Sequence, residues 1–132
     1  MFYLSRNSIE HMSGVDFRLK QIVYRALEKS KIDFGIPETG GLRTEEMQKA
    51  LYEAGKSKAD GVTNKSKHQY GLAVDVYAYV DGAASWESEH LTHIAAAFLQ
   101  AALELDTPIK WGGFFHSFTD MPHFELTDIA KG

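Results

Sequence analysis

The spacing of apolar and polar positions predicts three helices along the chain. Apolar residues recur every three or four positions over 15–29, 45–54 and 88–105, as on a helix with one buried face. The longest of these helices would bury a continuous apolar stripe: Leu91, Ile94, Ala95, Phe98, Ala102 and Leu105.

The middle helix has recognisable ends. Thr44 is a suitable N-cap, two acidic residues follow it in the first turn, and Gly55 is a suitable stop. Its buried face would consist of four residues: Met47, Ala50, Leu51 and Ala54.

Short segments between the helices have strand character. They are "DFGIPE" at 33–38, residues 72–80, "PIKW" at 108–111 and "HFEL" at 123–126. Helices interleaved with short strands predict an α+β fold, a small antiparallel sheet with helices packed on one face and a cleft on the other. With no internal repeat and no linker, residues 1–132 should form a single domain.

Composition narrows the function classes. The net charge is −4, and lysines gather only in one loop, at Lys56, Lys58, Lys65 and Lys67, which argues against nucleic-acid binding. The chain has no cysteine, which excludes disulfides, thiolate metal sites and a cysteine nucleophile. No apolar run approaches the ~18 residues of a membrane span. The N-terminus also lacks the pattern of a secretion signal. We therefore expect a monomer made in the cytoplasm, without stable membrane insertion.

The segment 72–80 contains a chemically unusual position. On a strand, Val74 and Val76 would face the core, so Asp75 would point to the opposite side. Gly71 permits a tight turn that brings His68 toward the same side. An imidazole and a carboxylate suit zinc, although for these two residues alone a solvated loop histidine and a surface aspartate are the simpler explanation.

A second segment, "DMPHFEL" at 120–126, supplies the missing groups. Because Phe124 would face the core, His123 would project to the cleft, with Asp120 in the loop before it. A catalytic zinc needs three protein ligands, an open position for water and a carboxylate that takes the proton from that water. His68, Asp75 and His123 as ligands and Asp120 as base complete this set.

These motifs resemble those of a known family. "SKHQYGLAVD" at 66–75 matches the SxHxxGxAxD signature of the zinc D-Ala-D-Ala carboxypeptidase and L-alanyl-D-glutamate peptidase family. "DMPHFE" at 120–125 matches its second signature, and "GGLRT" at 40–44 and "WGG" at 111–113 are also similar. The matches are collinear over about residues 40–126.

The resemblance implies roles for particular residues. His68, Asp75 and His123 correspond to the Zn²⁺ ligands, and Asp120 to the general base. Arg43 corresponds to an arginine that stabilises the oxyanion formed from the substrate carbonyl.

Two further residues become candidates for substrate binding, Ser66 and Gln48. The simpler alternatives are a loop hydroxyl for Ser66 and plain helix surface for Gln48. After "WGG" this chain has Phe114 and Phe115, where many relatives carry a polar residue and then tryptophan. This departure leaves the substrate preference open.

The resemblance is closest to phage endolysins that cut the L-alanyl-D-glutamate bond of peptidoglycan stem peptides. Such an enzyme is made in the host cytoplasm without a signal peptide and acts on the wall after release. The alternative within the family is a D-alanyl-D-alanine carboxypeptidase or dipeptidase. A zinc-stabilised module that binds wall peptides or a protein without cutting is the alternative outside enzymes.

Overall fold

The computed structural model describes residues 2–116 and 118–127. The helices are α1 (Arg6–His11), α2 (Phe17–Lys29), α3 (Glu45–Glu53) and α4 (Ser88–Glu104), with 3₁₀ turns η1 (Lys67–Tyr70) and η2 (Gly112–Phe114). The strands are β1 (Asp33–Gly35), β2 (Ala73–Asp75), β3 (Tyr77–Val80), β4 (Ala83–Ser85), β5 (Ile109–Trp111) and β6 (His123–Leu126). The α+β class is therefore confirmed. The pattern of apolar positions did not indicate α1 and β4.

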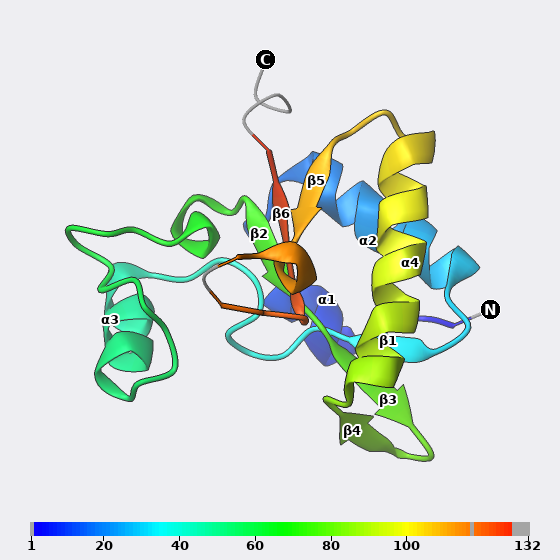
Figure 1. The fold of residues 1–132 in the computed structure, drawn as a ribbon, viewed down its shortest axis with the longest axis horizontal. Helices are drawn as coiled ribbons and strands as arrows, with labels where there is room; N and C mark the ends of the chain where they lie inside the picture. Colours follow the sequence, from blue (N-terminus) through cyan, green and yellow to red (C-terminus); the bar gives the residue numbers. More distant parts are fainter. Residues whose placement is uncertain (1, 117, 128–132) are drawn as a thin grey trace.

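The strands form two antiparallel sheets instead of one. Their orders are β1-β3-β4 and β2-β6-β5 (Figure 1). The predicted strand over 72–80 divides at Val76, whose N–H donates to the carbonyl of Pro122. Val76 lies opposite Pro122 in the register of β2 and β6, and the ladder ends there because proline has no N–H to return a second bond. From Tyr77 on, the chain pairs with β1 in the other sheet.

The core lies between the helix pair α2 and α4 and the strands. Helix α4 packs along α2 and against β3 and β5 (Figure 1). Phe98 of α4 stacks on Phe124 of β6 with ring centroids 4.0 Å apart, and both side chains are fully buried. The sheet β2-β6-β5 is thus backed by apolar packing on one face.

Helix α3 projects away from this core (Figure 1). Thr44 caps it as predicted, since its hydroxyl accepts the N–H of Met47. The predicted apolar face is wrong: Met47 is only half-buried, Ala50 is exposed, and the one buried residue of the helix is Gln48. Polar contacts therefore hold this helix in place of an apolar stripe.

No helix in the described part of the chain is long and apolar enough to cross a bilayer.

Candidate functional site

Three side chains from separate elements converge on one point. His68 Nε2 and His123 Nδ1 lie 3.2 Å apart, and Asp75 Oδ1 lies 3.2 Å from the first and 3.1 Å from the second. A tetrahedral zinc ion with bonds of about 2.0–2.1 Å holds neighbouring ligand atoms roughly 3.3 Å apart. The triangle therefore matches one face of a zinc coordination shell in both size and donor chemistry.

The register of the sheet creates half of this triangle. Asp75 of β2 lies directly opposite His123 of β6 in the antiparallel ladder. Neighbours across a ladder have side chains on the same face, so both point away from the buried Phe124. As predicted, the face opposite the core carries these two residues.

His68 enters from the turn η1, and the turn is built to hold it. The Ser66 hydroxyl accepts a hydrogen bond from the backbone N–H of His68. The side-chain oxygen of Gln69 accepts one from the backbone N–H of Ser66, which completes a capping box. Gly71 ends the turn in the left-handed region at φ 71°, and a side chain there would collide with the Gly14 carbonyl. Ring nitrogen Nδ1 of His68 bonds the carbonyl of Gly41 at 2.9 Å, which directs Nε2 to the triangle.

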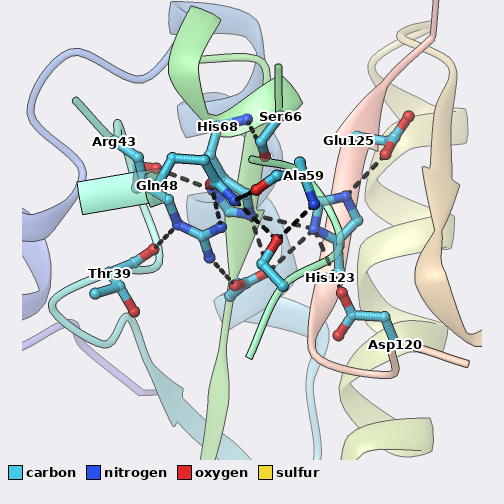
Figure 2. A network of polar contacts seen from close by, with 12 residues as sticks. Thr39, Arg43, Gln48, Ala59, Ser66, His68, Asp120, His123 and Glu125 are labelled. Atoms are coloured by element: carbon cyan, nitrogen blue, oxygen red, sulfur yellow. Dashed lines mark hydrogen bonds and ion pairs between the residues drawn. The ribbon is translucent and has the colours of Figure 1, made fainter. Parts of the chain in front are cut away.

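Each of the other two side chains of the triangle also has a second partner. His123 Nε2 donates to Glu125 Oε1 at 2.8 Å, leaving Nδ1 for the triangle (Figure 2). Asp75 Oδ2 accepts from Arg43 Nη2 at 3.0 Å. Such outer partners fix ring orientation and tautomer, as protein metal sites require. The residues present therefore fit a bound metal ion.

Arg43 is held by a network of its own. It is buried, its Nε donates to the Thr39 carbonyl at 2.7 Å, and its Nη1 donates to Gln48 Oε1 at 3.0 Å (Figure 2). The Gln48 amide in turn donates to Ser57 Oγ and to the Ala59 carbonyl. The guanidinium is thus fixed beside Asp75 by contacts on three sides.

The electrostatics of the triangle follow from this packing. Burial would raise the pKa of Asp75, but the charge of His68 and the bonds from both histidines outweigh burial and hold this pKa well below its usual range. Burial would lower the pKa of His123, but bonds to Asp75 and Glu125 outweigh it and raise this pKa to about 9. A metal ion at Nδ1 must displace a proton there, so binding releases a proton.

Asp120 lies beside the triangle without joining it. Its Oδ2 is 4.0 Å from His123 Nδ1, and 41% of its side chain is exposed. Burial raises the pKa of Asp120, and the nearby charge of Asp75 adds to the rise, while His123, His68 and Arg43 oppose it. A carboxylate with a raised pKa at the edge of a metal site is suited to accept a proton.

The triangle, Arg43 and Asp120 line one cleft of about 600 Å³. Its aromatic wall consists of Phe115, whose ring lies 5.8 Å from that of His123, and Phe118, 5.7 Å from Phe115 between centroids. Phe114 packs on Trp111 outside this lining and is largely exposed. Of the two phenylalanines that depart from the family pattern, Phe115 is the one in contact with the site.

The comparisons with known proteins agree with this geometry. The model of the phage L-alanyl-D-glutamate peptidase family matches residues 1–127. The L-alanyl-D-glutamate peptidase of Escherichia phage T5 is 30% identical over 125 residues, covering 90% of this chain and 85% of that protein. The chain belongs to this family. The predicted enzyme class, a peptidase, is thereby confirmed.

Solved structures extend the likeness to the fold. The Serratia marcescens L-Ala D-Glu endopeptidase ChiX is 35% identical, with a TM-score of 0.84 over 97% of this chain and 94% of that one. The vancomycin resistance D,D-pentapeptidase VanY is 20% identical, with a TM-score of 0.54 over 85% of this chain and 72% of that one. The second likeness concerns the fold alone.

The two predicted substrate contacts differ in position. Ser66 lines the cleft, although its hydroxyl already caps η1. Gln48 is neither helix surface nor accessible to a substrate, because its side chain is fully buried and its amide is bonded to protein groups. Its place beside Arg43 makes it a positioning residue.

Sequence reasoning missed Glu125, which holds His123 and pairs with Lys67 at 3.8 Å. The sequence does contain a signal for Glu125, because a side chain two positions after His123 on a strand points to the same face. Neither the Gly41 carbonyl behind His68 nor the Thr39 carbonyl behind Arg43 has such a signal, because backbone groups leave no trace in residue type.

Proposed function

We propose that this chain is a zinc peptidase that hydrolyses the L-alanyl-D-glutamate bond of peptidoglycan stem peptides, with His68, Asp75 and His123 holding the metal. The observation that carries the proposal is the His-Asp-His triangle with Asp120 at its edge, in a chain of the L-alanyl-D-glutamate peptidase family. Zinc bound there would activate a water molecule and polarise the substrate carbonyl.

Asp120 is the general base of this proposal. It accepts the proton of the attacking water and later delivers it to the leaving amine of D-glutamate. Its position suits this role, because Oδ2 lies 4.0 Å from a ligand atom and the side chain remains accessible from the cleft. Its raised pKa improves it as a proton acceptor compared with an ordinary aspartate.

Arg43 binds the oxygen on which negative charge develops. Its contacts with Thr39, Gln48 and Asp75 use three of the five N–H groups of a guanidinium, one on each nitrogen. Both terminal nitrogens thus keep an N–H for an oxyanion, and the group is fixed before substrate arrives. Loss of such a donor typically lowers the rate on the order of 10²–10³-fold.

The wider setting of the reaction is part of the same proposal. Residues 1–132 act as one catalytic domain, a monomer that is made in the host cytoplasm. It reaches peptidoglycan in the periplasm or cell wall after release, as an endolysin does. Ser66, at the rim of the cleft, contributes to substrate binding in addition to capping η1.

Mass spectrometry of purified peptidoglycan digested by the zinc-loaded protein tests the scissile bond. New L-alanine C-termini and D-glutamate N-termini are expected. Release of terminal D-alanine alone would instead indicate a D,D-carboxypeptidase. An absence of cleavage by a protein that binds zinc and peptidoglycan would indicate a binding module.

Two substitutions test the assigned roles. Asp120→Asn should lower hydrolysis by about 10²–10⁴-fold and leave zinc content unchanged, because the residue moves protons without ligating the metal. His123→Ala should lower both the rate of hydrolysis and the zinc content. Zinc content is measured by atomic absorption and hydrolysis with a synthetic stem peptide. Full activity of Asp120→Asn would overturn the assignment of the base.

A further inference from the structure

Two lysines line the same cleft. Lys56 and Lys58 lie in the loop that follows α3, and both side chains are exposed. The ammonium of Lys58 lies 4.8 Å from the ring centroid of Phe118, so this lysine contacts the aromatic wall. This contact orients Lys58 and still leaves its ammonium able to bind an anion.

The loop that carries these lysines is anchored from below. Ser57 and Ala59, which alternate with the lysines, both bind the buried amide of Gln48, at 2.8 and 2.9 Å. Gln48 also binds Arg43 (Figure 2). The loop that carries the two lysines is therefore anchored to the residue that also holds Arg43.

The charges in the cleft distinguish these lysines from its other cations. Arg43 is bonded to Asp75, and Lys67 pairs with Glu125 and binds the Leu126 carbonyl. Within residues 2–116 and 118–127, neither Lys56 nor Lys58 takes part in an ion pair. They are the cleft cations whose charge is not offset by a protein carboxylate.

The substrate class supplies a matching anion. In an L-alanyl-D-glutamate bond the amine of D-glutamate forms the scissile amide, and its two carboxyl groups lie on the leaving side. When one of them continues the peptide, the other remains a free carboxylate. A free carboxylate on the leaving side can be recognised by a cation that no protein carboxylate already offsets, and Lys56 and Lys58 supply such cations in this cleft.

We propose that Lys58, assisted by Lys56, forms the subsite for this free D-glutamate carboxylate. The inference rests on the proposed function, since it names a recognition element for the same bond. It places the leaving-side residue between the lysine loop and the wall of Phe115 and Phe118, with the scissile carbonyl toward Arg43.

A pair of substrates and a pair of variants test the subsite. The synthetic substrates are a peptide with L-alanyl-D-glutamate and its analogue in which the free carboxylate is a carboxamide. They are assayed with the unaltered zinc-loaded protein, with Lys58→Gln and with Lys31→Gln, an exposed lysine outside the cleft lining. Both Lys58→Gln and the carboxamide should lower kcat/KM about tenfold, mostly through KM.

The activity of Lys58→Gln toward the two substrates decides whether Lys58 binds the carboxylate. If Lys58 binds the carboxylate, Lys58→Gln should cut both substrates with nearly equal kcat/KM, since the second change removes nothing further. The carboxylate preference of the unaltered protein should weaken with added salt, and Lys31→Gln should retain it. A tenfold preference that persists in Lys58→Gln and in Lys56→Gln/Lys58→Gln overturns the subsite alone. Cleavage of neither substrate by the unaltered protein overturns the proposed function and the subsite with it.

Discussion

Helices α3 and α4 have similar patterns of apolar residues but are held in the molecule by different forces. Helix α4 buries seven residues, all of them apolar, and Phe98 stacks directly behind the strand that carries His123. Helix α3 buries only Gln48, which is joined by hydrogen bonds to Arg43 and to the lysine loop. One helix supports by packing the strand that carries the candidate ligand His123, and the other supports Arg43 and the lysine loop by polar contacts.

Because the two helices are held differently, changes in them should affect stability and activity to different extents. Apolar burial is worth about 25 cal/mol per Å² and tolerates small shifts, so α4 contributes mainly to the free energy of unfolding. A buried hydrogen-bond network contributes less net energy but fixes the positions of the groups it joins. Damage to α3 should therefore lower activity more than it lowers stability.

The largest effect on stability is expected from Phe98→Ala. The cavity behind β6 should lower the free energy of unfolding by about 3–5 kcal/mol, because Phe98 is fully buried between Phe34 and Phe124. Urea unfolding followed by circular dichroism measures this loss of unfolding free energy. Leu103→Ala, on the exposed face of the same helix, should change it by less than about 0.5 kcal/mol. A loss below about 1 kcal/mol for Phe98→Ala would contradict the view that packing holds α4.

A smaller loss of stability with a larger loss of activity is expected from Gln48→Ala. The change leaves Arg43 Nη1 and the groups of Ser57 and Ala59 without their partner, at a cost of about 1–3 kcal/mol. Misplacement of Arg43 should lower kcat/KM on the order of tenfold to a hundredfold. Lys49→Ala, the next and exposed position, is the matched control. Unaltered activity of Gln48→Ala would show that the network does not set the position of Arg43.

On strand β6, which α4 backs, Glu125→Ala tests how far Glu125 supports the candidate metal ligand His123. Zinc affinity should fall about 10–100-fold, because Glu125 orients the ring of His123. Glu125→Gln keeps an acceptor oxygen and should retain most of the affinity. Competition with a chromogenic chelator measures both, with the exposed Glu53→Ala as control. Equal affinity of Glu125→Ala and the unaltered protein would remove Glu125 from the site.

The smallest effect concerns the surface link between α2 and α4. Glu104 bonds Lys29 and Arg25, and the Lys29 bond chiefly holds the pKa of Glu104 below its ordinary value. Because the pKa is lower in the folded state, this link stabilises the fold above the unfolded pKa of about 4.3. The contribution is lost as the pH falls through the folded pKa.

The comparison of the unaltered protein with Glu104→Gln measures this link. Their unfolding free energies should differ slightly at neutral pH and converge in acid, and a salt titration should reduce the difference. A difference that grows as the pH falls would contradict the sign of the effect.

Several features could be predicted from the sequence because each depends on a local period. Alternation along 123–126 places His123 opposite to Phe124 whatever the strand pairs with, and the 3.6-residue period sets the buried stripe of α4. The spacing of His68 and Asp75 around Gly71 also specifies a turn followed by a strand. These local regularities identified the α+β class and the groups of the triangle.

The tertiary structure decided what depends on partners distant in the chain. The continuous strand pattern divides at Val76 because the residue opposite it, Pro122, has no N–H to continue the ladder. Gln48 is buried because Arg43 and the lysine loop close around it. A polar residue in an exposed helix has the same local pattern whether or not such partners arrive. The sequence by itself thus determined which residues could hold a metal. Only the packing of separate segments decided how those residues are oriented and which other residues position them.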